Sequence, residues 1–263
     1  MAALGVFGSR RFGWWLLRGA AGLTMLYILL PLIFVTWLSF FYQEIPSFPP
    51  ESYSLRWYQA IAVNERFVSG FALSLQLGVI ATAIGLTVGV PAALCLSRYR
   101  FKGREALNSL LLLPLVVPGV VLGMALYVSH VEVEIATGLP ILIVIPWTVR
   151  LVLASLAGFD RTLEEAAQNL GADRWTTFRR VTLPSILPGI VAAAMFGFVS
   201  SFGNLEMSLF LVGPGRTTLP IAILQYLEWK IDPTIAAVSV VQILLIGAAM
   251  LITDRFVKIS RVV

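Results

Sequence analysis

The sequence predicts an all-α membrane protein with six transmembrane helices. Of its 263 residues, 58% are hydrophobic and only 13% are charged, and the mean hydropathy is +0.87. Soluble domains carry about 25% charged residues, so this composition excludes an ordinary soluble enzyme. The charges are also unevenly placed and leave long charge-free runs. A helix needs about 20 apolar residues to cross the hydrocarbon core of a bilayer, and five of the runs reach that length.

A sixth span follows if Arg150 is tolerated between two shorter apolar runs. We expect one membrane domain covering residues 1–263, with spans at about 14–41, 68–96, 106–130, 139–159, 187–212 and 233–253. The first span is longer than the apolar stretch of a cleavable secretory signal, about 7–15 residues, so it is expected to stay as a helix. Prolines flank or interrupt every span, including Pro114 and Pro118 in the third.

The lysines and arginines predict the orientation of the spans. Most of the 19 fall before the first span, within 98–104, within 161–180, or after the sixth span. Basic residues collect in cytoplasmic loops, so both termini are expected in the cytoplasm. The pI of about 9.7 reflects this topology and requires no nucleic-acid partner.

Small residues recur at every fourth position in the second and fifth spans. The two stripes consist of Ala81, Gly85 and Gly89, and of Gly189, Ala193, Gly197 and Ser201. Such spacing lets helix backbones approach closely in lipid, and we expect both stripes to pack within the chain.

The segment 160–187, called the elbow below, is expected to fold as two short helices between the fourth and fifth spans. Thr162 and Glu165 have the spacing of a capping box, which predicts a helix start at Thr162. Gly171 is expected to supply a left-handed C-cap. The apolar positions between them share one helix face, and they are Leu163, Ala166, Ala167 and Leu170.

Asp173 is expected to cap the second short helix, which carries Trp175 and Phe178, and Pro184 is expected to end it. A rigid elbow of this kind can transmit a push from a partner into the membrane bundle. The alternative is a pair of interfacial helices that lie on the lipid surface.

The spacing within the elbow resembles a known signature. Glu165-Ala166-Ala167, three residues, Gly171, nine residues and then Val181-Thr182-Leu183-Pro184 match E-A-A-x3-G-x9-I-x-L-P, with valine for isoleucine as the sole departure. That signature is typical of permease subunits of ATP-binding-cassette importers. Segments 55–58, 98–103 and 213–220 also resemble the spermidine/putrescine-type subgroup.

The resemblance implies a type I importer permease of the MetI-like fold, whose elbow is a coupling helix that docks on a cytosolic ATPase. The solute would be small, of polyamine, amino-acid, phosphonate or iron type. By resemblance, the coupling residues are Glu164, Glu165, Ala166, Ala167, Gly171, Ala172, Phe178, Leu183 and Pro184.

The chain itself is not expected to hydrolyse ATP. A phosphate-binding loop needs Gly-Lys followed by Ser or Thr, whereas Lys102, Lys230 and Lys258 follow Phe, Trp and Val. The expected partners are two ATPase subunits that hold ATP and Mg²⁺, a second and different permease chain, an extracytoplasmic solute-binding protein and the lipid of a bacterial inner membrane. With Cys95 as the sole cysteine and His130 as the sole histidine, no metal site or cofactor is expected in this chain.

Charged and polar residues within the spans are candidates for the solute pathway, because burying them in lipid is costly. The candidates are Ser201, Asn204, Glu206, Ser208 and Arg150. Arg150 either lines the cavity or reaches back to the cytoplasmic surface. Asn204 and Glu206 lie about 200° apart on a regular helix, so they share one pathway only if Gly203 breaks that helix. Where polyamine permeases carry Ser-x-Asp-Asp, this chain has Ser-Phe-Gly-Asn.

Two other function classes would each need a particular residue. A stand-alone ion-coupled transporter would need a carboxylate at mid-membrane, for which Glu206 is the sole candidate. An intramembrane serine hydrolase could use only His130, and the chain has no Gly-x-Ser-x-Gly elbow to position a nucleophile.

Overall fold

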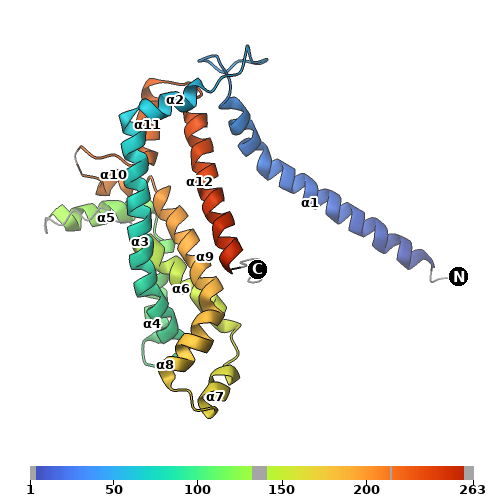
Figure 1. Cartoon of the computed structure of the whole chain (residues 1–263), viewed down its shortest axis with the longest axis vertical. Coiled ribbons are helices and arrows are strands. Elements are labelled where there is room, and N and C mark those ends of the chain that lie inside the picture. The colour runs from blue at the N-terminus through green and yellow to red at the C-terminus, as the bar shows by residue number, and fades with distance from the viewer. Residues whose placement is uncertain (1–3, 132–140, 214, 258–263) are drawn as a thin grey trace. The chain divides into compact units, whose positions relative to one another are not determined.

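The computed structural model describes residues 4–131, 141–213 and 215–257, and its regular structure there is helical. The chain forms two compact units. Unit 1 comprises Met1–Val63 and Lys230–Ile243, and unit 2 comprises Asn64–Trp229 and Leu244–Val263. Figure 1 labels the helices.

Unit 1 contains the long helix α1 (Leu4–Leu38) and the short helix α2 (Arg56–Val63). The loop between them is closed by an isolated antiparallel bridge from Phe41 to Tyr53. The indole Nε1 of Trp57 donates a hydrogen bond of 2.6 Å to the carbonyl oxygen of Phe41. None of the residues in the most apolar window of α1 is buried, as expected for a helix that faces lipid.

The core of unit 2 consists of three helices that pack on one another: α3 (Glu65–Arg98), α6 (Ile141–Ala157) and α9 (Leu183–Phe202). Near one end of α3 lies α11 (Leu219–Trp229). The last helix, α12 (Thr234–Val257), belongs to unit 1 up to Ile243 and to unit 2 beyond it.

The small-residue stripes lie at the contacts between these core helices, and both stripes are buried. A Cβ atom added to Gly85 of α3 would lie 2.8 Å from Cβ of Val144 on α6, and one added to Gly197 of α9 would lie 2.6 Å from Cγ1 of the same valine. Side chains larger than hydrogen would force the helices apart. The expectation that the stripes pack within the chain is therefore confirmed.

The third predicted span, 106–130, is not one helix. The structure has α4 (Arg104–Leu112), a 3₁₀ turn (Leu113–Leu115) and then α5 (Gly119–Val131), with a bend of 102° between the two parts. Pro114 and Pro118 explain the correction, since a proline removes a backbone donor and disfavours helical geometry in the residue before it.

The fifth predicted span, 187–212, also needs correction. Helix α9 begins earlier, at Leu183, and ends at Phe202 with Gly203 as its C-cap residue. A short non-helical segment follows, and then the single turn α10 (Ser208–Leu211). The helix is thus broken at Gly203. Asn204 and Glu206 therefore do not have to lie about 200° apart, as they would on a regular helix.

Fewer than six helices among the described residues are long and apolar enough to cross a membrane on their own. Among the described residues, four helices qualify: Gly13–Leu38, Glu65–Arg98, Arg174–Phe202 and Thr234–Thr253. The bent pair α4–α5 makes a fifth, and the apolar part of α6, Val144–Ala157, is too short. The predicted span 139–159 begins outside the described residues. The all-α membrane class is confirmed, whereas the count of six spans is not.

Candidate functional site

The elbow lies at the end of unit 2 opposite α11 (Figure 1). It consists of α7 (Thr162–Asn169), α8 (Arg174–Thr177) and a π-helical segment, η2 (Phe178–Thr182). Segment η2 runs directly into α9, so that Arg174–Phe202 forms one helix of 29 residues. A helix of this length gives the elbow a stiff connection to the membrane core.

The first helix of the elbow is capped differently from the prediction. Thr162 is the first helical residue and not the cap, so the capping box with Glu165 is wrong. Instead, Asp160 accepts a hydrogen bond of 2.9 Å from the backbone N–H of Thr162. This bond, together with one from the Thr162 hydroxyl, lowers the pKa of Asp160. Aspartate readily bonds a backbone N–H two residues ahead, and here it outcompetes the threonine cap.

Gly171 ends α7 in the left-handed conformation that the sequence predicts, with φ of 88°. The N–H of Gly171 donates to the carbonyl of Gln168, and the N–H of Ala172 donates to the carbonyl of Ala167, at 2.9 and 3.0 Å. This pair of bonds is the Schellman motif. The sharp turn that it makes sets the angle between the two arms of the elbow.

Asp173 caps α8, as predicted, by accepting a hydrogen bond of 3.1 Å from the N–H of Trp175. The Thr176 side chain and then the Trp175 backbone lower the pKa of Asp173. The expectation that Pro184 ends this helix is wrong. Pro184 is the second residue of α9, just after the π-helical segment η2, and the helix continues through it.

The elbow carries an exposed apolar surface. Leu163, Leu170 and Trp175 have exposed fractions of 52%, 90% and 66%. The ring of Trp175 stacks on Phe178 at a centroid distance of 5.8 Å. Apolar side chains on a charged loop indicate a surface that a partner protein or the lipid surface covers.

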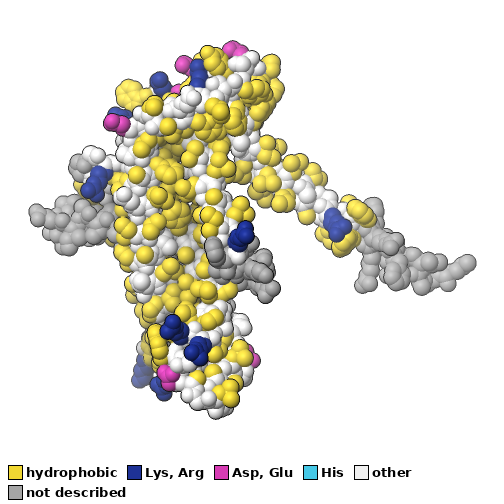
Figure 2. All heavy atoms as spheres, in the orientation of Figure 1, with side chains coloured by type: hydrophobic (Ala, Val, Ile, Leu, Met, Phe, Trp, Pro, Cys, Tyr) yellow, Lys and Arg dark blue, Asp and Glu magenta, His cyan; other side chains and the backbone are white. Residues whose placement is uncertain are grey.

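The predicted coupling residues divide by exposure. Glu165, Ala166, Gly171 and Pro184 are exposed, whereas Ala167, Ala172, Phe178 and Leu183 are partly buried. Glu164 differs from the others because its carboxylate points inward and pairs with Arg98 of α3. Figure 2 shows Lys and Arg side chains gathered at this end of unit 2, while hydrophobic side chains cover much of the length of α3.

The candidate pathway residues near the end of α9 are largely engaged in local structure. Ser201 is buried in the core, and its hydroxyl has no hydrogen-bond partner. The Asn204 side chain accepts a hydrogen bond of 2.8 Å from the N–H of Met207, and the Ser208 hydroxyl donates one of 2.5 Å to the Asn204 carbonyl. Asn204 and Ser208 therefore shape the non-helical segment after α9. Arg150 is exposed on α6.

Glu206 lies where two helix breaks meet. It is exposed in the segment after α9, and a Cβ atom added to Gly119, the first residue of α5, would lie 3.2 Å from Cβ of Glu206. One turn further, a Cβ atom on Gly123 would lie 2.9 Å from the ring of Phe210. The glycine spacing in 119–123 is the sequence signal that could have predicted this contact.

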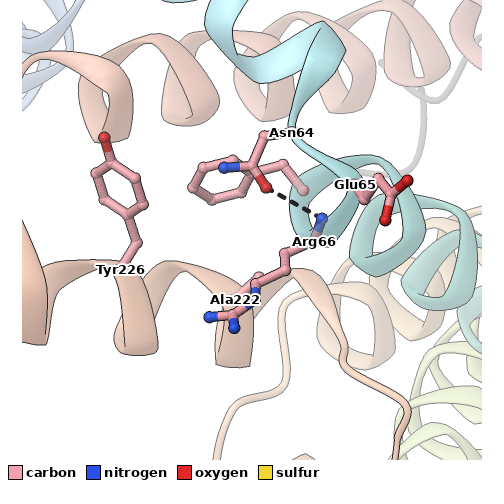
Figure 3. Close-up of a pocket in the computed structure, with 6 residues that line it drawn as sticks. Asn64, Glu65, Arg66, Ala222 and Tyr226 are labelled. Carbon is pink, nitrogen blue, oxygen red and sulfur yellow. Dashed lines mark hydrogen bonds between the residues drawn. The ribbon is translucent and has the colours of Figure 1, made fainter.

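A separate pocket of about 330 Å³ lies at the other end of α3. The Asn64 side chain accepts a hydrogen bond of 3.0 Å from the N–H of Arg66, and this bond is the dashed line in Figure 3. Phe67 is buried beside the ring of Tyr226, at a centroid distance of 5.3 Å. Glu65 and Ala222 complete the lining. The pocket is built from both polar and aromatic groups, and the sequence did not indicate it.

The chain is similar to known permeases along most of its length. It is 30% identical over 209 residues to the putrescine transport system permease protein PotI of Escherichia coli (strain K12), covering 74% of this chain and 73% of that one. It is 26% identical over 214 residues to the spermidine/putrescine transport system permease protein PotC of Haemophilus influenzae, covering 79% and 83%.

Among solved structures, a bacterial ABC transporter involved in the import of the acidic polysaccharide alginate has a chain with the same fold. The TM-score is 0.70 at 16% identity, and the match covers 94% of this chain and 97% of that one. Residues 85–261, more than half of the chain, match the family described as binding-protein-dependent transport system inner membrane component. The chain therefore belongs to this family of importer permease subunits.

Proposed function

We propose that the chain is the solute-translocating subunit of an ATP-driven importer and that its elbow receives the motion of an ATPase. The observation that carries this proposal is the exposed apolar surface of the elbow, whose second arm is continuous with the 29-residue helix Arg174–Phe202. A push on that surface turns or tilts α9 as a rigid rod. Because α9 packs on α3 and α6, its motion would repack the core of unit 2.

The assembly that we propose contains two ATPase subunits with ATP and Mg²⁺, a second permease chain and a solute-binding protein. A solved alginate transporter in complex with a substrate-bound periplasmic protein has the same fold at a TM-score of 0.66. We place the elbow and both termini in the cytoplasm, since the basic residues favour that side. The pocket at Asn64 and Tyr226 then faces the binding protein. Residues 1–263 act as one permease domain in this proposal.

The test is a crosslink from the elbow to the ATPase. Ala167→Cys in a Cys95→Ser background places a single thiol on α7. We expect it to crosslink to the co-expressed ATPase subunit, and we expect uptake into vesicles to require ATP and the binding protein. A matched control, Ser69→Cys at the opposite end of α3, should give no such crosslink. Uptake without ATP, driven by an ion gradient, would instead support a stand-alone transporter.

We further propose that the solute pathway passes the point where the start of α5 meets the non-helical segment after α9. Interrupted membrane helices leave backbone groups available to a solute, and Glu206 is the exposed acid at this point. Glu206→Gln is expected to lower the uptake rate about tenfold, the effect of losing one charge-assisted contact of ~1.4 kcal/mol.

The control for this prediction is Glu105→Gln on α4, also an exposed glutamate. Both variants should yield the same amount of assembled complex. A Glu206→Gln complex that transports at the rate of the Glu105→Gln complex would remove Glu206 from the pathway.

A further inference from the structure

Two arginines from other segments bind the end of α3 that faces the elbow. Nε of Arg104 donates a hydrogen bond of 2.7 Å to the carbonyl of Leu96, and Nη2 of Arg161 donates one of 2.7 Å to the carbonyl of Ser97. The last carbonyls of a helix have no partners within the helix, and cations there are favourable. Arg161 directly precedes α7, so this bond already ties the elbow to α3.

A second tie is the cluster of Arg98, Glu164 and Thr182, called the clasp below. Arg98 is the last residue of α3 and forms an ion pair with Glu164 of α7. The same carboxylate oxygen of Glu164 accepts a hydrogen bond from the hydroxyl of Thr182, the last residue of η2. Nη2 of Arg98 also lies 3.2 Å from the Thr182 oxygen. The clasp joins three segments: the end of α3, the first arm of the elbow and the end of η2, which runs into α9.

The clasp is partly shielded from water, because the Arg98 side chain is 33% exposed while its two partners are less so. Thr182 is fully buried, and the side chain of Glu164 is only 15% exposed. Fully exposed ion pairs contribute little to stability, whereas removing one partner of a buried pair leaves the other charge unpaired at a larger cost. This pair lies between the two cases, with the carboxylate as its more buried member. The neighbouring Glu165 is exposed and has no part in the clasp. Adjacent glutamates of the elbow therefore face different surroundings.

We infer that Glu164 is a positioning residue for coupling and does not contact the ATPase. Through the clasp, the motion of α7 reaches α3 directly, in addition to reaching α9 through η2. Without the clasp, a docked elbow would move α9 but not α3. ATP would then be hydrolysed without transport of solute. This inference rests on the proposed function of the elbow.

The experiment uses the assembled complex with its ATPase and binding protein. The variants are Glu164→Gln, which removes the charge, and Thr182→Val, which removes only the hydroxyl; Arg100→Gln is the control for a nearby exposed arginine. The readouts are the Ala167→Cys crosslink and the number of ATP molecules hydrolysed per solute transported. We expect Glu164→Gln to keep the crosslink and to raise that number at least about fivefold, with a smaller rise for Thr182→Val.

A charge swap, Arg98→Glu with Glu164→Arg, is expected to restore part of the coupling, even if the single variants assemble poorly. The inference is overturned if Glu164→Gln couples like the control, if it loses the crosslink, which would make Glu164 a docking residue, or if the swap restores nothing. Failure of the proposed function gives a different result, since the parent complex itself would then show no crosslink.

Discussion

Gly171→Trp is expected to reduce ATP-driven uptake to background while the permease still folds. A Cβ atom at Gly171 would meet no atom of this chain within 4 Å, so the indole stands in open space on the exposed side of the elbow. The left-handed backbone there adds about 1–2 kcal/mol for a residue other than glycine. A bulky ring on this surface would hold the ATPase away from Ala166 and Leu163. The measurement is binding-protein-stimulated ATP hydrolysis together with uptake in proteoliposomes.

The matched variant is Gly171→Asn, because asparagine tolerates the left-handed conformation better than other side chains and is far smaller than tryptophan. We expect it to keep most of the uptake. Wild-type uptake by a fully assembled Gly171→Trp complex would show that no partner covers this part of the elbow.

Gly85→Leu is expected to destabilise the core of unit 2 more than any single change on its surface. Even a Cβ atom at Gly85 would lie 2.8 Å from Cβ of Val144, and the rest of a leucine side chain has no room between α3 and α6. Overpacking of this kind costs about 1–3 kcal/mol or more. We expect Tm of the purified protein in detergent to fall by at least about 5 °C.

Gly247→Leu on α12 is the control, since a Cβ atom there meets nothing within 4 Å. It should leave Tm almost unchanged. Adding Val144→Ala to Gly85→Leu should recover part of the loss by making space for the larger side chain. Equal Tm values for Gly85→Leu and Gly247→Leu would contradict the close packing of α3 on α6.

The sequence was most informative where a feature depends on neighbours in the chain. Gly171 and Asp173 take the conformations that their positions predict, because turns and caps are set by residues within a few positions. The same locality explains one error at the start of α7. Both Asp160 and Thr162 are suitable cap residues, and local propensity alone could not rank them.

Features that depend on distant residues were not predictable from one sequence. The clasp joins Arg98 to partners 66 and 84 positions away, and nothing in the spacing of these residues points to their meeting. Hydropathy showed where apolar runs lie but averaged over the breaks at Pro118 and Gly203. The prolines were visible, but their positions do not give the bend of 102°, and the helix α10 that α5 packs against lies far away in the sequence.

The π-helical segment η2 affects the direction in which the elbow points around the axis of α9. An α-helix turns by about 100° per residue, and a π-helical turn accommodates an extra residue without breaking the helix. Removing one residue from η2 would therefore let it return to α-helix with little rotation, whereas removing one from α9 would turn Leu163, Leu170 and Trp175 around the helix axis by roughly 100°. The number of residues in this helix, as much as their chemistry, sets the direction in which the elbow points.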